Sequence, residues 1–206
     1  MTRRILFATT NPNKTAELRA VLAPLGFEVT SLDALAKVPP EPEEDQDTFA
    51  GNARLKARYY ARETGIACLA EDSGLEVDAL GGAPGVYSAR YSGAGGSREE
   101  RDRANNEKLL RELAGRPGAP RNARFVCAMC VAEPDGTVTA EVSGTYEGVV
   151  AEAPRGENGF GYDPLLYLPD VGKTSAELSS AEKNARSHRG KAARALAEVL
   201  GKRPGA

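Results

Sequence analysis

A short apolar run that stops at two adjacent carboxylates constrains this chain most strongly. Ile66 to Ala70 has the composition of a buried strand, and Glu71 and Asp72 follow it directly, before Ser73-Gly74. Two anions at the end of a core strand repel each other and lose hydration unless a cation or a donor compensates them. A bound divalent metal explains the pair, and a solvated turn at the strand exit is the alternative.

A glycine-rich loop comes after these carboxylates. Six glycines lie between positions 81 and 96, around Tyr87, Arg90 and Tyr91. Backbone this permissive exceeds what a simple connection needs, so the loop favours a functional site over a plain linker.

Size and charge narrow the class of protein. A chain of 206 residues is long enough for one substantial core, which predicts a single domain over residues 1–206. The net charge of −2 argues against a nucleic-acid partner. With no apolar run of about 18 residues and no apolar leader, we expect no membrane partner, no secretory signal and a cytoplasmic location.

A strand, a polar turn and a helix open the chain. Arg4 to Ala8 predicts a buried strand, Asn11 can cap the following helix, and Gly26 ends it. The turn consists of Thr9, Thr10, Asn11, Pro12, Asn13 and Lys14. Free N–H groups at a helix start, together with a lysine, indicate a phosphate site, although an ordinary capped helix has the same pattern.

Further along, an acidic loop leads into a second helix. Residues 38–47 are rich in proline and acid, which is typical of a solvated loop. The helix from Thr48 to Thr64 aligns Phe49, Asn52, Lys56 and Tyr60 along one side. That side faces either solvent or a ligand.

The second half of the chain predicts a mixed sheet. A capping box at Ser97 and Glu100 opens a long helix, and Pro134-Asp135-Gly136 joins two strands as a hairpin. Glycines on both sides of Phe160 leave its ring free to stack on a flat base, whereas an aromatic that anchors a loop is the common alternative. The single histidine, His188, precedes a tail helix predicted from Ala192 to Leu200 and is more often structural than functional.

Four motifs together resemble the inosine triphosphate pyrophosphatase family. They are Thr-x-Asn-x-x-Lys at 9–14, Glu-Asp-Ser-Gly-Leu at 71–75 with the loop at 81–91, Phe-Gly-Tyr-Asp at 160–163, and Glu-Lys-Asn-x-x-Ser-His-Arg at 182–189. The resemblance spans nearly the whole chain. One departure is Gly51, where the family usually has glutamate.

The resemblance implies an enzyme that hydrolyses inosine, deoxyinosine and xanthosine triphosphates to the monophosphate and pyrophosphate. It implies an α/β fold, one domain of two lobes around a long mixed sheet with flanking helices and the active-site cleft between the lobes, and a Mg²⁺-dependent homodimer. Asp72 would be catalytic and would hold the metal with Glu44 and Glu71, with Glu43 as a competitor of Glu44. Substrate contacts are implied for residues 9–14 and for Lys56, Ser73, Phe160, Gly161, Tyr162, Asp163, Lys183, His188 and Arg189. A related pyrophosphatase for other modified nucleotides and a nucleotide-binding regulator without turnover are the alternatives.

Overall fold

A computed structural model describes residues 3–201, which contain one seven-stranded mixed sheet with flanking helices. The strand order is β2-β1-β3-β4-β5-β6-β7. The strands are β1 (Arg3–Phe7), β2 (Phe27–Ser31), β3 (Cys68–Val77), β4 (Asn122–Ala132), β5 (Val138–Val150), β6 (Leu166–Leu168) and β7 (Lys173–Thr174). β1 is parallel to β2 and β3, and β6 is antiparallel to β5 and β7. The predicted α/β class with a mixed sheet is confirmed, and the predicted cleft stays a prediction.

The chain divides into two compact units. The first contains residues 1–72, 127–144 and 187–206, and the second contains residues 73–126 and 145–186. β3, β4 and β5 contribute residues to both units. No helix of the described residues 3–201 has the length and apolarity that a membrane crossing requires.

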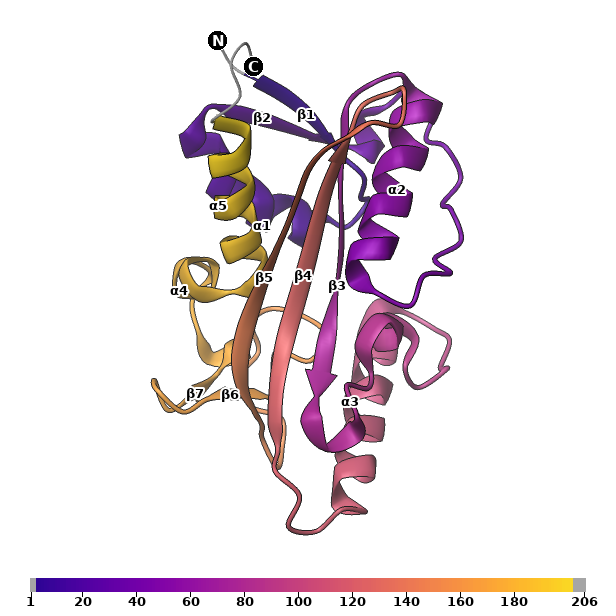
Figure 1. Cartoon of the computed structure of the whole chain (residues 1–206). Helices are drawn as coiled ribbons and strands as arrows, with labels where there is room; N and C mark the ends of the chain where they lie inside the picture. The colour runs from indigo at the N-terminus through magenta and orange to yellow at the C-terminus, as the bar shows by residue number, and fades with distance from the viewer. Residues whose placement is uncertain (1–2, 202–206) are drawn as a thin grey trace. The chain divides into compact units, whose positions relative to one another are not determined.

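In the first unit, helices cover both faces of the sheet. The helices are α1 (Pro12–Leu22), α2 (Phe49–Thr64) and α5 (His188–Gly201). Figure 1 shows α1 and α5 together on one face and α2 on the other. Leu69 of β3 belongs to the core between the sheet and the α1 and α5 pair, where it joins Leu18 and Leu196. Because side chains alternate along a strand, its neighbours Cys68 and Ala70 point toward α2.

The second unit has a separate core. The second unit contains the helices α3 (Arg98–Ala114) and α4 (Ser180–Arg186), and its core is built on α3. Leu109 and Leu113 of α3 pack with Leu75, Tyr162 and Leu166 in one apolar cluster.

Several local predictions are confirmed. The Asn11 side chain accepts hydrogen bonds from the first turn of α1, and Ser97 forms a capping box with Glu100 at the start of α3. Between β4 and β5, the amide of Gly136 donates to the carbonyl of Glu133 in the predicted hairpin turn.

Two boundary predictions are wrong. The strand predicted to end at Ala70 continues to Val77, so Glu71 and Asp72 lie inside β3. It continues because the side chains of Leu75 and Val77, beyond the expected turn at Ser73-Gly74, are buried in the core. The last helix begins at His188, four residues before Ala192, since the Ser187 hydroxyl accepts a bond from the Gly190 amide and caps it there.

Candidate active site

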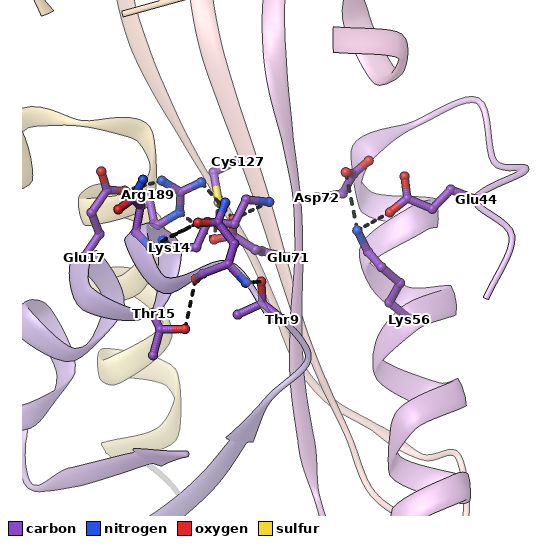
Figure 2. Close-up of polar contacts among 12 residues, drawn as sticks. Thr9, Lys14, Thr15, Glu17, Glu44, Lys56, Glu71, Asp72, Cys127 and Arg189 are labelled. Carbon is purple, nitrogen blue, oxygen red and sulfur yellow. Dashed lines mark hydrogen bonds and ion pairs between the residues drawn. The ribbon is translucent and has the colours of Figure 1, made fainter. Parts of the chain in front are cut away.

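Glu71 and Asp72 belong to two different clusters on opposite faces of β3 (Figure 2). Successive side chains of a strand point to opposite faces, so Glu71 follows Leu69 toward α1 and α5, and Asp72 follows Ala70 toward α2. The Glu71 cluster consists of Lys14, Glu17, Glu71, Cys127 and Arg189. The Asp72 cluster consists of Glu44, Asn52, Lys56 and Asp72.

The Glu71 cluster is a buried, compensated ion network. Arg189 Nε and Nη2 each donate to a separate Glu71 oxygen at 2.8 Å, and Lys14 Nζ lies 3.2 Å from Glu71 Oε1. A further ion pair joins Arg189 to Glu17, and the Cys127 thiol lies 3.6 Å from Glu71 Oε2. Burial by itself raises the pKa of Glu71, but Arg189 and Lys14 outweigh it and hold that pKa well below its usual range. Glu71 is therefore an anion whose charge is already neutralised by the protein.

Side chains of the turn before α1 accept hydrogen bonds from its own amides, so its predicted phosphate contacts stay a prediction. Asn11 Oδ1 accepts from Asn13 N at 3.0 Å and from Lys14 N at 3.4 Å, and Thr9 Oγ1 accepts from Asn11 N at 3.1 Å. Thr10, Pro12 and Asn13 are exposed. Lys14 keeps 23% of its side chain exposed while it contacts Glu71. A positive side chain and a helix start thus share one exposed turn, which is the chemistry of an anion site.

The Asp72 cluster gathers two carboxylates around one lysine. Lys56 Nζ lies 3.5 Å from Asp72 Oδ1 and pairs with Glu44, and Asn52 Nδ2 donates to Asp72 Oδ2 at 3.1 Å. Asn52 and Lys56 stand one turn apart on α2, so both reach the same carboxylate. Burial raises the pKa of Asp72, with Glu44 adding to the effect and Lys56 opposing it. Burial lowers the pKa of Lys56, but Asp72 and Glu44 outweigh burial and raise it.

The two carboxylates of this cluster, Glu44 and Asp72, fit a magnesium ion only if substrate phosphates and water supply the remaining ligands. Within residues 3–201 no group of three or more acidic, histidine or cysteine side chains is gathered to hold a metal. Mg²⁺ prefers carboxylate oxygens and is commonly bound by one or two of them together with substrate phosphates and water. Glu44 and Asp72 supply that number. Glu71 lies on the other face with Arg189 and Lys14, so its predicted place in the metal shell stays a prediction.

Glu44 and Glu43 provide a matched test of the metal shell. Glu43 is exposed, whereas Glu44 contacts Lys56. We expect Glu44→Gln to raise the Mg²⁺ concentration needed for half-maximal activity at least about tenfold. Glu43→Gln should leave it unchanged. Magnesium titrations of both variants distinguish them, and an effect confined to Glu43→Gln would transfer the ligand to that position.

In the second unit, Asp163 organises the Phe-Gly-Tyr-Asp segment. Asp163 Oδ2 accepts from Phe160 N at 2.8 Å and from Lys183 Nζ at 2.7 Å, and its Oδ1 accepts from Ser175 Oγ at 2.8 Å. The Tyr162 hydroxyl donates to the Ser88 carbonyl at 2.9 Å inside the core. Asp163 and Tyr162 are therefore internal supports, and they fix the loop that carries Phe160.

The structure places other predicted residues away from open solvent. Ser73 is half-buried next to Asp72 in β3, and His188 and Arg189 are buried in the first turn of α5. Arg189 is 2% exposed and holds Glu71 and Glu17, so its predicted base contact stays a prediction.

Sequence reasoning missed Glu17 and Asp102. Asp102 accepts a hydrogen bond from the Gly161 amide at 2.8 Å, and Glu17 pairs with Arg189. The signal for Glu17 was its position three residues after Lys14, on the same side of α1. No comparable signal existed for Asp102, because its partner lies 59 residues away in the sequence.

The chain is similar to known proteins in both sequence and fold. The model of the Ham1 family matches residues 5–199. Two proteins named dITP/XTP pyrophosphatase are close in sequence. The one from an Exiguobacterium species is 52% identical over 96% of this chain and 97% of its own length, and the one from Thermus thermophilus is 51% identical over 95% and 91%.

Two solved structures are similar. A HAM1 protein from Coxiella burnetii has a TM-score of 0.88 at 38% identity, covering 98% of this chain and 100% of its own. A nucleoside-triphosphatase, dITP/XTP pyrophosphatase, from Mycobacterium abscessus has a TM-score of 0.73 at 44% identity, covering 94% and 98%.

Proposed function

The chain belongs to the Ham1 family, and on that premise we propose that it hydrolyses inosine, deoxyinosine and xanthosine triphosphates to the monophosphate and pyrophosphate. The resemblance found in the sequence is confirmed at the level of the family. The observation that carries the activity is the Asp72 cluster, where two carboxylates meet at a buried lysine beside β3. We propose that the whole chain serves this one activity as a single domain, which the match over residues 5–199 supports.

In this proposal Asp72 is the catalytic carboxylate. It accepts a proton from the attacking water as the water oxygen bonds to the α-phosphorus and the bond from that phosphorus to the leaving pyrophosphate breaks. Glu44 and Asp72 would hold a magnesium ion, which when bound would supply positive charge to the phosphates. Lys56 and Lys14 neutralise charge that develops on the pyrophosphate, and the exposed turn at residues 9–14 adds the positive end of the α1 dipole.

Base recognition is proposed for the second predicted set of residues. Phe160 offers a ring for stacking, and Lys183 is a buried cation beside that ring. Donors from Lys183, His188 and Arg189 satisfy a 6-keto oxygen, whereas the 6-amino group of adenine leaves a donor unpaired at a cost of about 1–3 kcal/mol. Ser73, next to Asp72 in the sequence, is also proposed to contact the substrate.

The decisive experiment identifies the products. We expect inosine, deoxyinosine and xanthosine triphosphates to release pyrophosphate and a monophosphate with magnesium present, and to be stable with a chelator present. Adenosine triphosphate should react far more slowly because of its 6-amino group. Release of inorganic phosphate and a diphosphate would assign a different reaction, and tight binding without products would make the protein a regulator. Sedimentation of the same sample tests the proposed homodimer.

A further inference from the structure

The ring of Phe160 is covered by two cations of very different character. Arg98 Cζ lies 4.5 Å from the ring centroid, and Lys183 Nζ lies 4.9 Å from it. Lys183 is 5% exposed and is fixed by Asp163 at 2.7 Å. The Arg98 side chain is 36% exposed, and its nearest carboxylate, Asp102, is 3.8 Å away. Arg98 is therefore the cation of the two that can move.

The position of Arg98 in its helix works against local stability. It is the first residue of α3, where the helix dipole disfavours a positive side chain. Its pair with Asp102 at i,i+4 also has the less favourable order, with the cation on the N-terminal side. A residue that conflicts with both rules at the edge of a ligand site has a role outside the helix.

The first turns of α3 also hold the segment that carries Phe160. Asp102 accepts from Gly161 N at 2.8 Å, and Asn106 Nδ2 donates to Gly161 O at 3.0 Å. Both polar groups of Gly161 are thus hydrogen-bonded to α3, which ties the segment that carries Phe160 to the helix that carries Arg98. When a base enters, only the long Arg98 side chain needs to yield.

We propose that Arg98 is a base-contacting residue: its guanidinium covers Phe160 in the absence of nucleotide and lies on the outer face of the purine when the purine stacks on Phe160. This inference rests on the proposed function, because it needs a purine as the ligand. A planar guanidinium stacks on flat π-systems, and an arginine is better suited to this than a lysine. The guanidinium contacts the face of the base and not its edge. It therefore increases affinity for every purine, and other residues determine which purine is preferred.

The test separates this contact from charge attraction to the phosphates. We expect Arg98→Ala to raise KM for inosine triphosphate by about 2- to 30-fold with kcat unchanged, and to raise the Kd of inosine, which has no phosphate, by the same factor. Arg98→Lys should recover less than half of this loss in free energy. Arg103→Ala removes an exposed arginine from the same helix and should match the wild type.

Three outcomes would overturn the inference. A lower KM in Arg98→Ala would make the residue a competitor of the base, an unchanged KM would make it a surface cation, and a loss seen with the triphosphate but not with inosine would make it a phosphate contact. Wild-type pyrophosphate release is measured in the same series. If the wild type hydrolyses inosine triphosphate and Arg98→Ala binds like it, only the inference about Arg98 fails; if the wild type releases no pyrophosphate, the proposed function fails.

Discussion

Replacing Asp72 by asparagine is expected to lower kcat for inosine triphosphate by about 10²–10⁴-fold while the protein stays folded. The amide keeps the shape of the side chain and can still accept the bond from Asn52, but it can neither take a proton nor hold a divalent metal as an anion. Burial already raises the pKa of Asp72, so the charge itself does not stabilise the fold. Lys56 keeps Glu44 as its partner.

Steady-state kinetics at saturating magnesium, together with thermal unfolding, check this result. The matched control is Asp45→Asn, which neutralises an exposed carboxylate next to Glu44 and should leave kcat within twofold of the wild type. Turnover of Asp72→Asn near the wild-type rate would remove Asp72 from the chemistry.

Arg189→Ala is expected to have the largest effect on stability. The substitution leaves Glu71, which is 3% exposed, with Lys14 as its only remaining cation in the Glu71 cluster, and it also removes the ion pair between Arg189 and Glu17. Removing one member of a buried ion pair typically costs about 3–5 kcal/mol. For a chain of this length that corresponds to a fall in Tm of roughly 6–20 °C. Calorimetry or denaturant unfolding measures it directly.

The control for Arg189 is an arginine with equally good geometry but with solvent around it. Arg54 Nε and Nη2 donate to both oxygens of Glu141 at 2.7 and 3.1 Å, and its side chain is 44% exposed. Arg54→Ala should cost no more than about 1 kcal/mol. Adding Glu71→Gln to Arg189→Ala should restore part of the loss, because the uncompensated charge is then gone. Equal stability of the two single variants would refute the buried network as a stabilising unit.

The same Arg189 variant tests the predicted base contact. If the guanidinium also bound the 6-keto oxygen, kcat/KM should fall more for inosine triphosphate than for adenosine triphosphate. If it acts only within the Glu71 cluster, kcat/KM for both nucleotides should fall by the same factor, in proportion to the fraction of folded protein. The assays are run below the Tm of the variant.

The sequence predicted what depends on neighbours in the chain. Caps at Asn11 and Ser97 and the hairpin turn at 134–136 are local hydrogen-bonding patterns, and each was found in place. The partners of Glu71 were not predictable in this way, since Arg189 lies 118 residues further along the chain. The turn dipeptide Ser73-Gly74 predicts an early end of β3, but the alternating apolar residues Leu75 and Val77 behind it continue the strand. A strand continued through Glu71 and Asp72 would have predicted their opposite directions.

The alternation along β3 makes the chemistry depend on strand register. β3 pairs with β1 so that Cys68 lies opposite Leu6 and Leu69 opposite Phe7. A slip by one residue would move every side chain to the other face. In one direction Glu71 would take the place of Asp72 beside Lys56, and Ala70 would take the place of Glu71 beside Arg189. In the other direction Asp72 would take the place of Glu71, one methylene short of the guanidinium, and Ser73 would take the place of Asp72. A single-residue insertion or deletion in the connection between α2 and β3 would shift the register of β3 unless the connecting loop absorbs it. Both clusters would then be lost together, although the sequence still contains every site residue.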